Sequence, residues 1–319
     1  MDIVHCLDDR YVPFCGTAIE SLCQNNVDNA VRYHIVSTSL DEENKLSLRE
    51  IVEKHGKSIT FYDIDESILK DCVVRKNDHV SLAAYLRILI PQILPCDLHK
   101  ALYLDCDLVV CGNLSGLLSE DIDGYACGAV LDGATDDVRT YNRLKYGSDK
   151  GYFNTGVLLY NLDYWRENNI TETIFSFIAE YPERLLFWDQ DAINSVLVEK
   201  IRQLPFRYNM TDPFYMRNTP LRQKYLNEIN ACLSDPTILH FATASKPWLS
   251  KNQPHPLKDE FYKYLAMTKW SNDFPFKKPL SLKRRFMNFI EYSLGIRIER
   301  VKPSDYLTKN EICVANVLI

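Results

Sequence analysis

The chain has 319 residues, of which 46% are hydrophobic and 25% are charged. These values are ordinary for a globular protein, and the length suits one large α/β domain with a small appendage. The formal net charge of −6 argues against a general nucleic-acid-binding protein. This charge is unevenly spread, because residues 274–302 carry a net charge of +6 and the rest of the chain therefore sums to −12. We expect an acidic main domain over residues 1–270 and a basic tail over residues 271–319.

The N-terminal segment and the cysteines indicate in which cellular compartment the protein is found. The segment Met1–Cys6 has no basic region before its apolar residues, so it does not resemble a signal peptide. No window reaches the ~18 uncharged apolar residues of a membrane-spanning helix. The ten cysteines include no C-x-x-C pair, and several lie in apolar runs, as buried reduced thiols do. These features predict a cytoplasmic protein without disulfides.

The first hundred residues alternate between strand and helix patterns, as in an open α/β sheet flanked by helices. Apolar runs predict strands, which in chain order are Asp2–Leu7, Val31–Val36, Ser58–Ile64 and Leu102–Leu104. Apolar side chains at helical spacing predict the intervening helices, which are Pro13–Gln24, Asp41–His55 and Ser81–Ile90. Pro91 is expected to end the last of these helices.

The rest of the main domain continues the pattern less regularly. The further strands predicted are Ala126–Leu131, Thr155–Asn161 and Thr237–Phe241, and the further helices are Ile170–Tyr181 and Gln190–Glu199. The eleven glycines include neither G-x-G-x-x-G nor a P-loop motif. Any diphosphate held here must therefore be held by a metal ion and side chains.

Two carboxylates, Asp105 and Asp107, directly follow the apolar run Leu102–Leu104. Side chains of an extended segment alternate faces, so both carboxylates can point the same way while Cys106 points into the core. Like charges held so close repel unless a cation lies between them, and oxygen ligands suit a hard divalent ion such as Mn²⁺ or Mg²⁺. Asp8 follows the first predicted strand and should share the same edge of the sheet. The alternative is a solvated acidic turn that binds no metal ion.

Five short motifs occur in order along the chain. They are Asp8-Asp9-x-Tyr11, Leu104-Asp105-Cys106-Asp107, Tyr152-Phe153-Asn154-Thr155-Gly156-Val157, Asp189-Gln190-Asp191 and His240-x5-Lys246-Pro247-Trp248. Together they closely resemble the glycosyltransferase family 8 enzymes, a retaining group that includes bacterial lipopolysaccharide α-galactosyl- and α-glucosyltransferases and glycogenin. The resemblance covers residues 1–270 and implies the GT-A fold, a Rossmann-like mixed sheet flanked by helices, here with a small basic helical appendage.

The resemblance also implies a metal site. Its ligands would be Asp105, Asp107 and His240, which leave room for two diphosphate oxygens around Mn²⁺. Lys246 would then place a positive charge beside the leaving diphosphate. A hydrogen-bonded core histidine and a surface lysine are the structural alternatives for His240 and Lys246.

For the nucleotide of the donor, the resemblance implies backbone contacts at Cys6, a hydrogen bond between Asp8 and uracil, and stacking of Tyr11 on the base. Cys106 and Thr243 would also lie along the donor, with Thr243 where a glycine often approaches the diphosphate. A helix cap is the alternative role for Asp8.

For the sugar of the donor, the resemblance implies contacts from Arg87, Asn154 and Asp189, with Gln190 beneath the reacting anomeric carbon. An ion-pair partner is the alternative for Arg87, and a turn-stabilising side chain is the alternative for Asn154. For Asp189-Gln190-Asp191 the alternative is a helix N-cap with acids in the first turn, and both roles can hold at once, since one carboxylate can cap while another binds sugar.

The implied reaction moves a hexose, galactose or glucose, from a UDP-sugar to a glycan acceptor with retention. Retention requires either two inversions or attack on the face that the leaving group departs from. Gln190 is a poor nucleophile, which favours same-face attack without deciding it. A glycogenin-like protein that glucosylates its own tyrosine, and a non-catalytic sugar-nucleotide-binding protein, are the alternatives.

The basic tail has its own pattern. Leu282, Phe286, Phe289 and Ile290 form a helical stripe beside the cationic residues 283–285. A cationic amphipathic helix with aromatic residues predicts a peripheral contact with the cytoplasmic face of the inner membrane. The acceptor would then be a lipid-linked saccharide such as a lipopolysaccharide or lipooligosaccharide core. A solvated helix packed on the main domain is the alternative.

Overall fold

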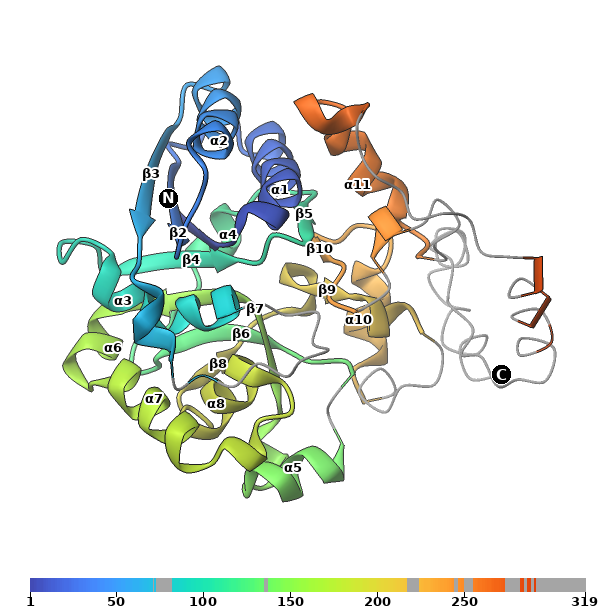
Figure 1. Ribbon diagram of the computed structural model, residues 1–319. Helices are drawn as coiled ribbons and strands as arrows, with labels where there is room; N and C mark the ends of the chain where they lie inside the picture. The colour runs from blue at the N-terminus through green and yellow to red at the C-terminus, as the bar shows by residue number, and fades with distance from the viewer. Residues whose placement is uncertain are drawn as a thin grey trace.

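The computed structural model describes residues 1–70, 72, 82–134, 137–216, 224–243, 246–249, 255–272, 282, 283, 286, 287 and 290. A seven-stranded mixed sheet with helices on both faces forms the centre of the fold, and a three-stranded sheet lies beside it (Figure 1). The strand order is β3-β2-β1-β4-β7-β6-β8 in the large sheet and β5-β10-β9 in the small one. The predicted α/β class, with a mixed sheet flanked by helices, is confirmed.

The first four strands of the large sheet are parallel, and β7 runs antiparallel to both of its neighbours. Nearly all residues of β1, β4 and β7 are buried, as expected for strands that helices cover on both faces. The strands of the large sheet are β1 (Asp2–Cys6), β2 (Arg32–Ser37), β3 (Ser58–Asp63), β4 (Lys100–Leu104), β6 (Cys127–Leu131), β7 (Phe153–Asn161) and β8 (Ile201–Gln203). Those of the small sheet are β5 (Leu108–Val110), β9 (Met210–Thr211) and β10 (Ile238–His240).

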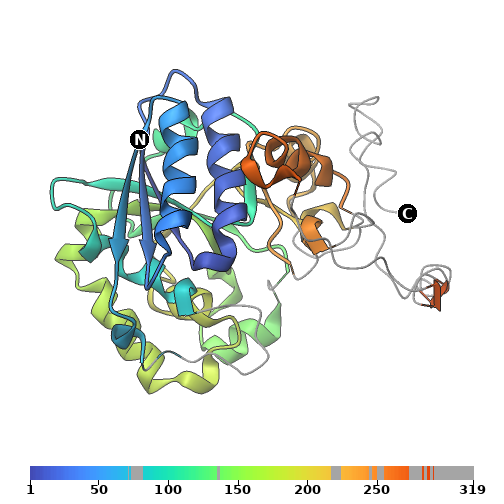
Figure 2. The same cartoon turned by 45° about the horizontal axis from the view of Figure 1, so that its top comes forward.

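Two long helices cover one face of the large sheet, and a group of three helices covers the other (Figure 1). Figure 2 shows the first pair, α1 (Val12–Asn25) and α2 (Glu42–Lys54), side by side against the parallel strands. The opposite group is α6 (Leu162–Glu167), α7 (Ile170–Glu180) and α8 (Trp188–Val196). Further helices are α3 (Ile90–Ile93), α4 (Ser115–Leu118), α5 (Val138–Leu144), α10 (Leu226–Cys232) and α11 (Lys258–Leu265). Among the residues described, no helix has the length and apolar character needed to cross a bilayer.

The segment before β4 differs from its prediction. Residues Leu82–Leu89 form a 3₁₀ helix rather than an α-helix, and Pro91 lies in the first turn of α3 instead of ending a helix. Proline is tolerated there because the N–H groups of the first turn have no partner within the helix. The prediction that Pro91 stops the helix is therefore wrong.

Two strands also depart from the predicted pattern. Strand β7 begins at Phe153, so Asn154 lies within a strand and not in a turn before it. Strand β5, which follows Asp107 directly, was missed because Leu108–Val110 is too short to show a period. Through β5 the chain passes from the large sheet into the small one.

The end of the main domain packs on its beginning. Helix α11 lies against α1, and Trp270, in the 3₁₀ turn Lys269–Ser271, covers Gly16 of α1. A Cβ atom added at Gly16 would lie 2.3 Å from Cζ3 of Trp270.

We expect Gly16→Ala to destabilise the protein by about 1–3 kcal/mol, because overpacking against the ring outweighs the better helix propensity of alanine. The urea midpoint should fall, and Trp270→Leu in the same background should restore part of the loss. An unchanged midpoint would contradict this packing.

The boundary at residue 270 and the amphipathic tail remain predictions. Only five positions of residues 273–319 are described, and Phe289, Arg284 and Arg285 lie outside the described residues. Leu282 and Phe286 are exposed.

Candidate active site

Strand pairing brings the three predicted metal ligands together from distant parts of the sequence. Strands β1 and β4 are parallel neighbours, and the chain leaves β4 through Asp105 and Asp107 before entering β5. Strand β5 pairs antiparallel with β10, with His240 opposite Leu108. The N–H of Phe241 donates to the carbonyl of Asp107 over 2.9 Å, which fixes His240 beside the two carboxylates.

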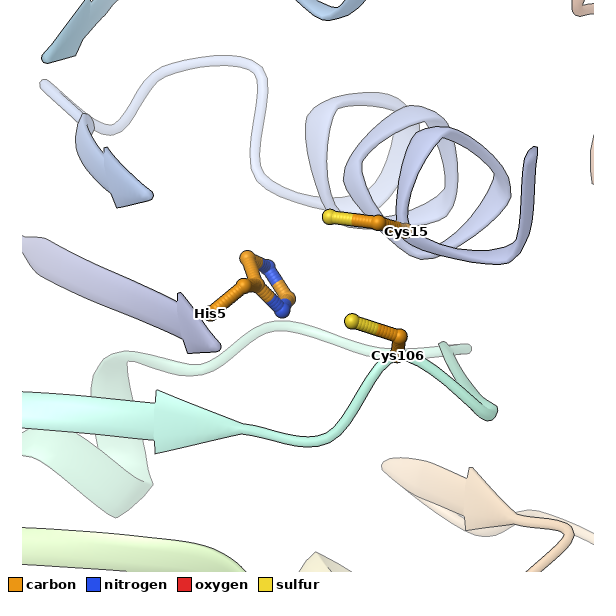
Figure 3. Close-up of side chains that lie close together, drawn as sticks. All are labelled: His5, Cys15 and Cys106. Carbon is orange, nitrogen blue, oxygen red and sulfur yellow. The ribbon is translucent and has the colours of Figure 1, made fainter. Parts of the chain in front are cut away.

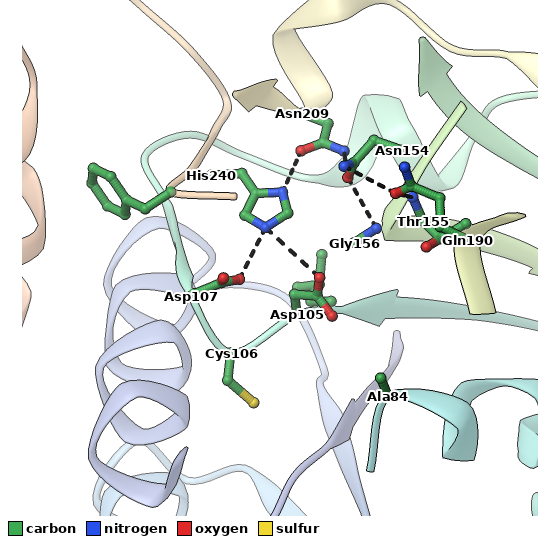
Figure 4. A network of polar contacts seen from close by, with 12 residues as sticks. Ala84, Asp105, Cys106, Asp107, Asn154, Thr155, Gly156, Gln190, Asn209 and His240 are labelled. Atoms are coloured by element: carbon green, nitrogen blue, oxygen red, sulfur yellow. Dashed lines mark hydrogen bonds and ion pairs between the residues drawn. The ribbon is translucent and has the colours of Figure 1, made fainter. Parts of the chain in front are cut away.

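The ligand atoms of Asp105, Asp107 and His240 all lie within 4.8 Å of one another (Figure 4). His240 Nε2 is 2.9 Å from Asp107 Oδ1 and 3.7 Å from Asp105 Oδ2. The imidazole is almost fully buried, while the carboxylates are partly exposed. Cys106, between the aspartates, turns its sulfur away from them and is buried, as predicted.

Lys246 contributes a cation to the same cluster. Its ammonium group donates to Asp107 Oδ2 and to the backbone carbonyl of Phe241. Pro247 and Trp248, which follow Lys246, are buried, and Trp248 stacks on Phe14 with ring centroids 4.0 Å apart. Burial acts to raise the pKa of Asp107, but Lys246 and His240 outweigh it and hold that pKa well below its usual value.

A hydrogen-bond relay leads to the imidazole of His240, and the donor and the acceptor of each of its bonds can be assigned. The N–H of Gly156 can only donate and lies 3.0 Å from Asn154 Oδ1, while the Asp132 carboxylate accepts from Asn154 Nδ2 over 3.0 Å. These two contacts establish which atom of the Asn154 amide is the oxygen and which is the nitrogen. Asn209 must then donate through Nδ2 to Asn154 Oδ1, over 2.8 Å, and present its Oδ1 to His240 Nδ1, also at 2.8 Å (Figure 4).

The relay decides which nitrogen of His240 carries the proton. Because Asn209 Oδ1 is an acceptor, Nδ1 of the neutral ring is the donor and Nε2 keeps its lone pair. In the neutral ring this lone pair faces the carboxylate oxygens of Asp105 and Asp107, where a cation can bridge the three groups. In the protonated ring Nε2 instead donates to Asp107 Oδ1 over 2.9 Å. One imidazole nitrogen and carboxylate oxygens form a donor set that fits Mn²⁺, or Mg²⁺ as a harder alternative.

Arg87 is buried between two carboxylates. Its guanidinium lies 3.0 Å from Asp105 Oδ1 and 3.1 Å from Asp189 Oδ2, and it donates to the carbonyl of Thr155 over 2.8 Å. The ion-pair alternative for Arg87 is thus what the structure contains. Arg87 also lines the cavity described below, so a contact with a donor remains a prediction.

Burial raises the pKa of Asp189 to about 6, even though Arg87 beside it acts in the opposite direction. Asp189 lies in the first turn of α8, whose N-cap residue Phe187 makes no side-chain cap. The capping contacts come from Asp191, which accepts from the N–H groups of Leu186 and Phe187. The alternative of a helix start with acids in its first turn is thus present in the structure, with the backbone contacts made by Asp191, while Asp189 is not the N-cap residue.

Gln190 is held at both ends of its amide. Its Oε1 accepts from the N–H of Thr155 over 3.1 Å, and its Nε2 donates to Asp132 over 3.2 Å and to Tyr152 over 3.1 Å. Asn154 donates to the same Oε1 over 3.3 Å. The lone pairs of Gln190 Oε1 are therefore occupied by the donors Thr155 and Asn154.

A cavity of about 450 Å³ joins these groups. The predicted residues that line it are Tyr11, Arg87, Asp105, Asp107, Asn154, Asp189, Gln190, His240, Thr243 and Lys246. Thr243 is tied to Asp212 through its hydroxyl, over 2.8 Å. A contact between the backbone N–H of Thr243 and the donor diphosphate remains a prediction.

A smaller cavity of about 110 Å³ adjoins the carboxylates and is lined by Cys6, Asp8, Tyr11 and Cys106 among others. Asp8 caps the 3₁₀ turn Asp9–Tyr11 by accepting from the N–H of Arg10, and it also pairs with the Arg10 guanidinium over 2.8 Å. The capping alternative for Asp8 is present, and its contact with uracil remains a prediction.

Comparisons with known proteins were made by sequence and by fold. The profile described as "Glycosyl transferase family 8" matches residues 2–252. The chain belongs to this family. General stress protein A of Bacillus subtilis (strain 168) is 33% identical over 279 residues, which are 85% of this chain and 95% of the relative. A lipopolysaccharide 1,2-glucosyltransferase of Escherichia coli is 26% identical over 85% of this chain and 79% of its own length.

The fold comparison agrees with the family. The crystal structure of the galactosyltransferase LgtC with donor and acceptor sugar analogues superposes with a TM-score of 0.77 at 22% identity, covering 90% of this chain and 99% of that one. The GT-A-like fold expected from the sequence is therefore confirmed. Glycosyltransferase family 8 is a family of hexosyltransferases, so the enzyme class expected for this chain is confirmed at that level.

Three side chains of the site were missed by the sequence analysis. Asp132 directly follows the predicted strand Ala126–Leu131, so the rule that strand ends carry the site would have found it. Thr155 lay inside a quoted motif without an assigned role. Asn209, which follows the 3₁₀ turn Phe206–Tyr208, has no signal in the local sequence.

Proposed function

We propose that this family 8 member transfers a hexose, galactose or glucose, from a UDP-sugar to a hydroxyl of a glycan acceptor, with retention at the anomeric carbon. The observation that carries the proposal is the convergence of Asp105, Asp107 and the Nε2 lone pair of His240 on the wall of the larger cavity, beside Lys246. A divalent cation held by these three residues would supply charge neutralisation for the diphosphate of the donor.

The remaining residues of the cavity suit the parts of such a donor. The smaller cavity, with Asp8 and Tyr11, offers a carboxylate and an aromatic ring to the base. Lys246 can follow the departing diphosphate, because its ammonium lies at the edge of the metal ligands. Asp189 and Asn154 also line the larger cavity, where they would contact the sugar hydroxyls of the donor.

The contacts of Gln190 and Asp189 support same-face attack. A two-inversion route needs a free nucleophile on the sugar's far side. The carbonyl oxygen of Gln190 already accepts from Thr155 and Asn154, and Asp189 Oδ2 is engaged by Arg87 and Thr155. In the same-face route an oxygen of the leaving diphosphate takes the proton of the acceptor hydroxyl.

We infer a cell-surface glycan, such as lipopolysaccharide or another lipid-linked saccharide, as the acceptor class. Relatives described as lipopolysaccharide 1,2-glucosyltransferase and lipopolysaccharide 1,3-galactosyltransferase support it at 26% and 25% identity. The name of the 33% identical relative, general stress protein A, mentions no acceptor. The proposed place of action is the cytoplasmic face of the inner membrane, where a basic tail would meet anionic lipid.

A panel of UDP-galactose, UDP-glucose and the UDP-N-acetylhexosamines, assayed for UDP release with Mn²⁺, tests the donor. We expect slow hydrolysis of one hexose donor, loss of that hydrolysis in EDTA, and recovery when Mn²⁺ is returned. Hydrolysis that is unchanged in EDTA would overturn the metal-dependent reaction. The intact mass of the protein after each reaction would reveal hexoses added to the chain itself, the outcome expected of a self-glucosylating primer.

The raised pKa of Asp189 predicts a pH dependence of the same reaction. The carboxylate is ionised above about pH 6 and takes up a proton below it, so its charge opposite Arg87 is lost as the pH falls. Donor turnover should decrease toward about tenfold per pH unit below that point. Asp189→Asn should lower the plateau and abolish this acidic limb. Asp163→Asn, at a partly exposed carboxylate that pairs with His99, should leave the profile unchanged. Persistence of the same limb in Asp189→Asn would assign it to another group.

A further inference from the structure

A second group of potential metal ligands lies beneath the carboxylate pair. It consists of His5 in β1, Cys15 in α1 and Cys106 between the two aspartates. Their ligand atoms lie within 4.8 Å of one another, and all three residues are buried. Figure 3 shows the three side chains pointing into a shared space between the strand, the helix and the loop that follows β4.

The imidazole of His5 directs a lone pair into this space. Its Nδ1 lies 2.7 Å from the carbonyl oxygen of Leu104, which can only accept, so Nδ1 carries the proton. Nε2 is buried and has no hydrogen-bond partner among the described residues. Burial lowers the pKa of His5 to about 4, so the ring stays neutral at neutral pH. A buried acceptor left without a partner destabilises the folded state, and a bound cation would remove that penalty.

We propose that His5, Cys15 and Cys106 form a binding site for a thiophilic d¹⁰ cation, Zn²⁺ or Cu⁺. Two thiolates and one neutral imidazole are soft and borderline ligands, which select these ions over Mn²⁺ and Mg²⁺. The two thiolate charges balance Zn²⁺, so the filled site is neutral within an apolar core. The two thiol protons leave to solvent as the ion binds.

The dimensions of the site are compatible with such an ion. Metal–ligand bonds of about 2.0–2.3 Å need the ligand atoms roughly 3.3–4 Å apart, a contraction that side-chain rotation supplies. Without an ion, the thiol of Cys106 donates to the carbonyl oxygen of Cys6 over 3.8 Å. Cys106 also lines the smaller cavity, whereas His5 and Cys15 do not.

The proposed site is separate from the one formed by Asp105, Asp107 and His240. The sulfur of Cys106 points away from the carboxylates, so the two donor sets face opposite sides of one loop (Figure 4). Hard and soft ions should therefore occupy different sites, which makes the two independently measurable.

Co²⁺ added to the reduced, chelator-treated protein is the probe, because thiolate ligation gives an intense charge-transfer absorption that carboxylate and imidazole ligation does not. We expect this band in the wild type, its displacement by one equivalent of Zn²⁺, and its loss in Cys15→Ala and Cys106→Ala. The band should persist in Asp107→Asn and in Cys127→Ala, which removes a buried thiol from β6. Native mass spectrometry with Zn²⁺ and with Cu⁺ separates the two ions.

Absence of the band in the wild type, or its survival in both thiol variants, would overturn the site. Circular dichroism checks that each variant is folded. If Cys106→Ala is unfolded, Cys106→Val, whose side chain fills a volume similar to that of cysteine, takes its place.

Discussion

Asp105→Ala should reduce Mn²⁺-dependent UDP release by at least ~10³-fold, because it removes a metal ligand and the charge compensation that the donor diphosphate needs. The fold should survive, since Arg87 keeps Asp189 as its second carboxylate partner. Donor hydrolysis and Mn²⁺ binding, both measured on the purified variant, give the rate and the affinity separately.

A matched control is Asp63→Ala, which removes an exposed carboxylate that pairs with Lys45 at the end of β3. Its hydrolysis rate should stay within a factor of two of the wild type. Equal rates for Asp105→Ala and the wild type would remove the metal assignment, and with it the main support for the proposed function.

Asn209→Leu should weaken Mn²⁺ binding by about 10–100-fold, as expected when the partner that orients a metal-binding histidine is lost. Leucine is similar in size but cannot accept from His240 Nδ1 or donate to Asn154 Oδ1, so the imidazole loses its preferred tautomer. In Asn209→Asp one carboxylate oxygen can still accept from His240 Nδ1. The other oxygen would face Asn154 Oδ1, so two acceptors would lie opposite each other. The affinities should therefore fall in the order wild type, Asp variant, Leu variant.

The tautomer itself is the decisive readout for Asn209. In the metal-free wild type at alkaline pH, ¹⁵N chemical shifts should show His240 protonated at Nδ1, whereas Asn209→Leu should show a mixture of both tautomers. Asn168→Leu, at an exposed amide that donates to the backbone carbonyl of Tyr164, serves as the control. Mn²⁺ affinity within twofold of the wild type in Asn209→Leu would show that the relay does not position the ligand.

Local patterns predicted much of the fold. Hydrophobic runs and helical spacing placed β1, β2, β3, α1 and α2 to within a residue or two, because the alternation of buried strands and amphipathic helices is a property of neighbouring residues. Short elements escaped prediction for the same reason. Three residues of β5 and two of β9 carry no period, and they become strands only through their pairing with β10.

The sequence by itself determined the family, the α/β sheet and the candidate ligands Asp105, Asp107 and His240, since these depend on local periodicity and on ordered motifs. The tertiary structure alone decided that Asn209 fixes the imidazole, that Arg87 is shared by two carboxylates, and that His5 lies near two thiols. These contacts join residues far apart in the chain. In the relay, which atom donates and which accepts in one hydrogen bond depends on the neighbouring hydrogen bond. No local pattern of residue types encodes that dependence.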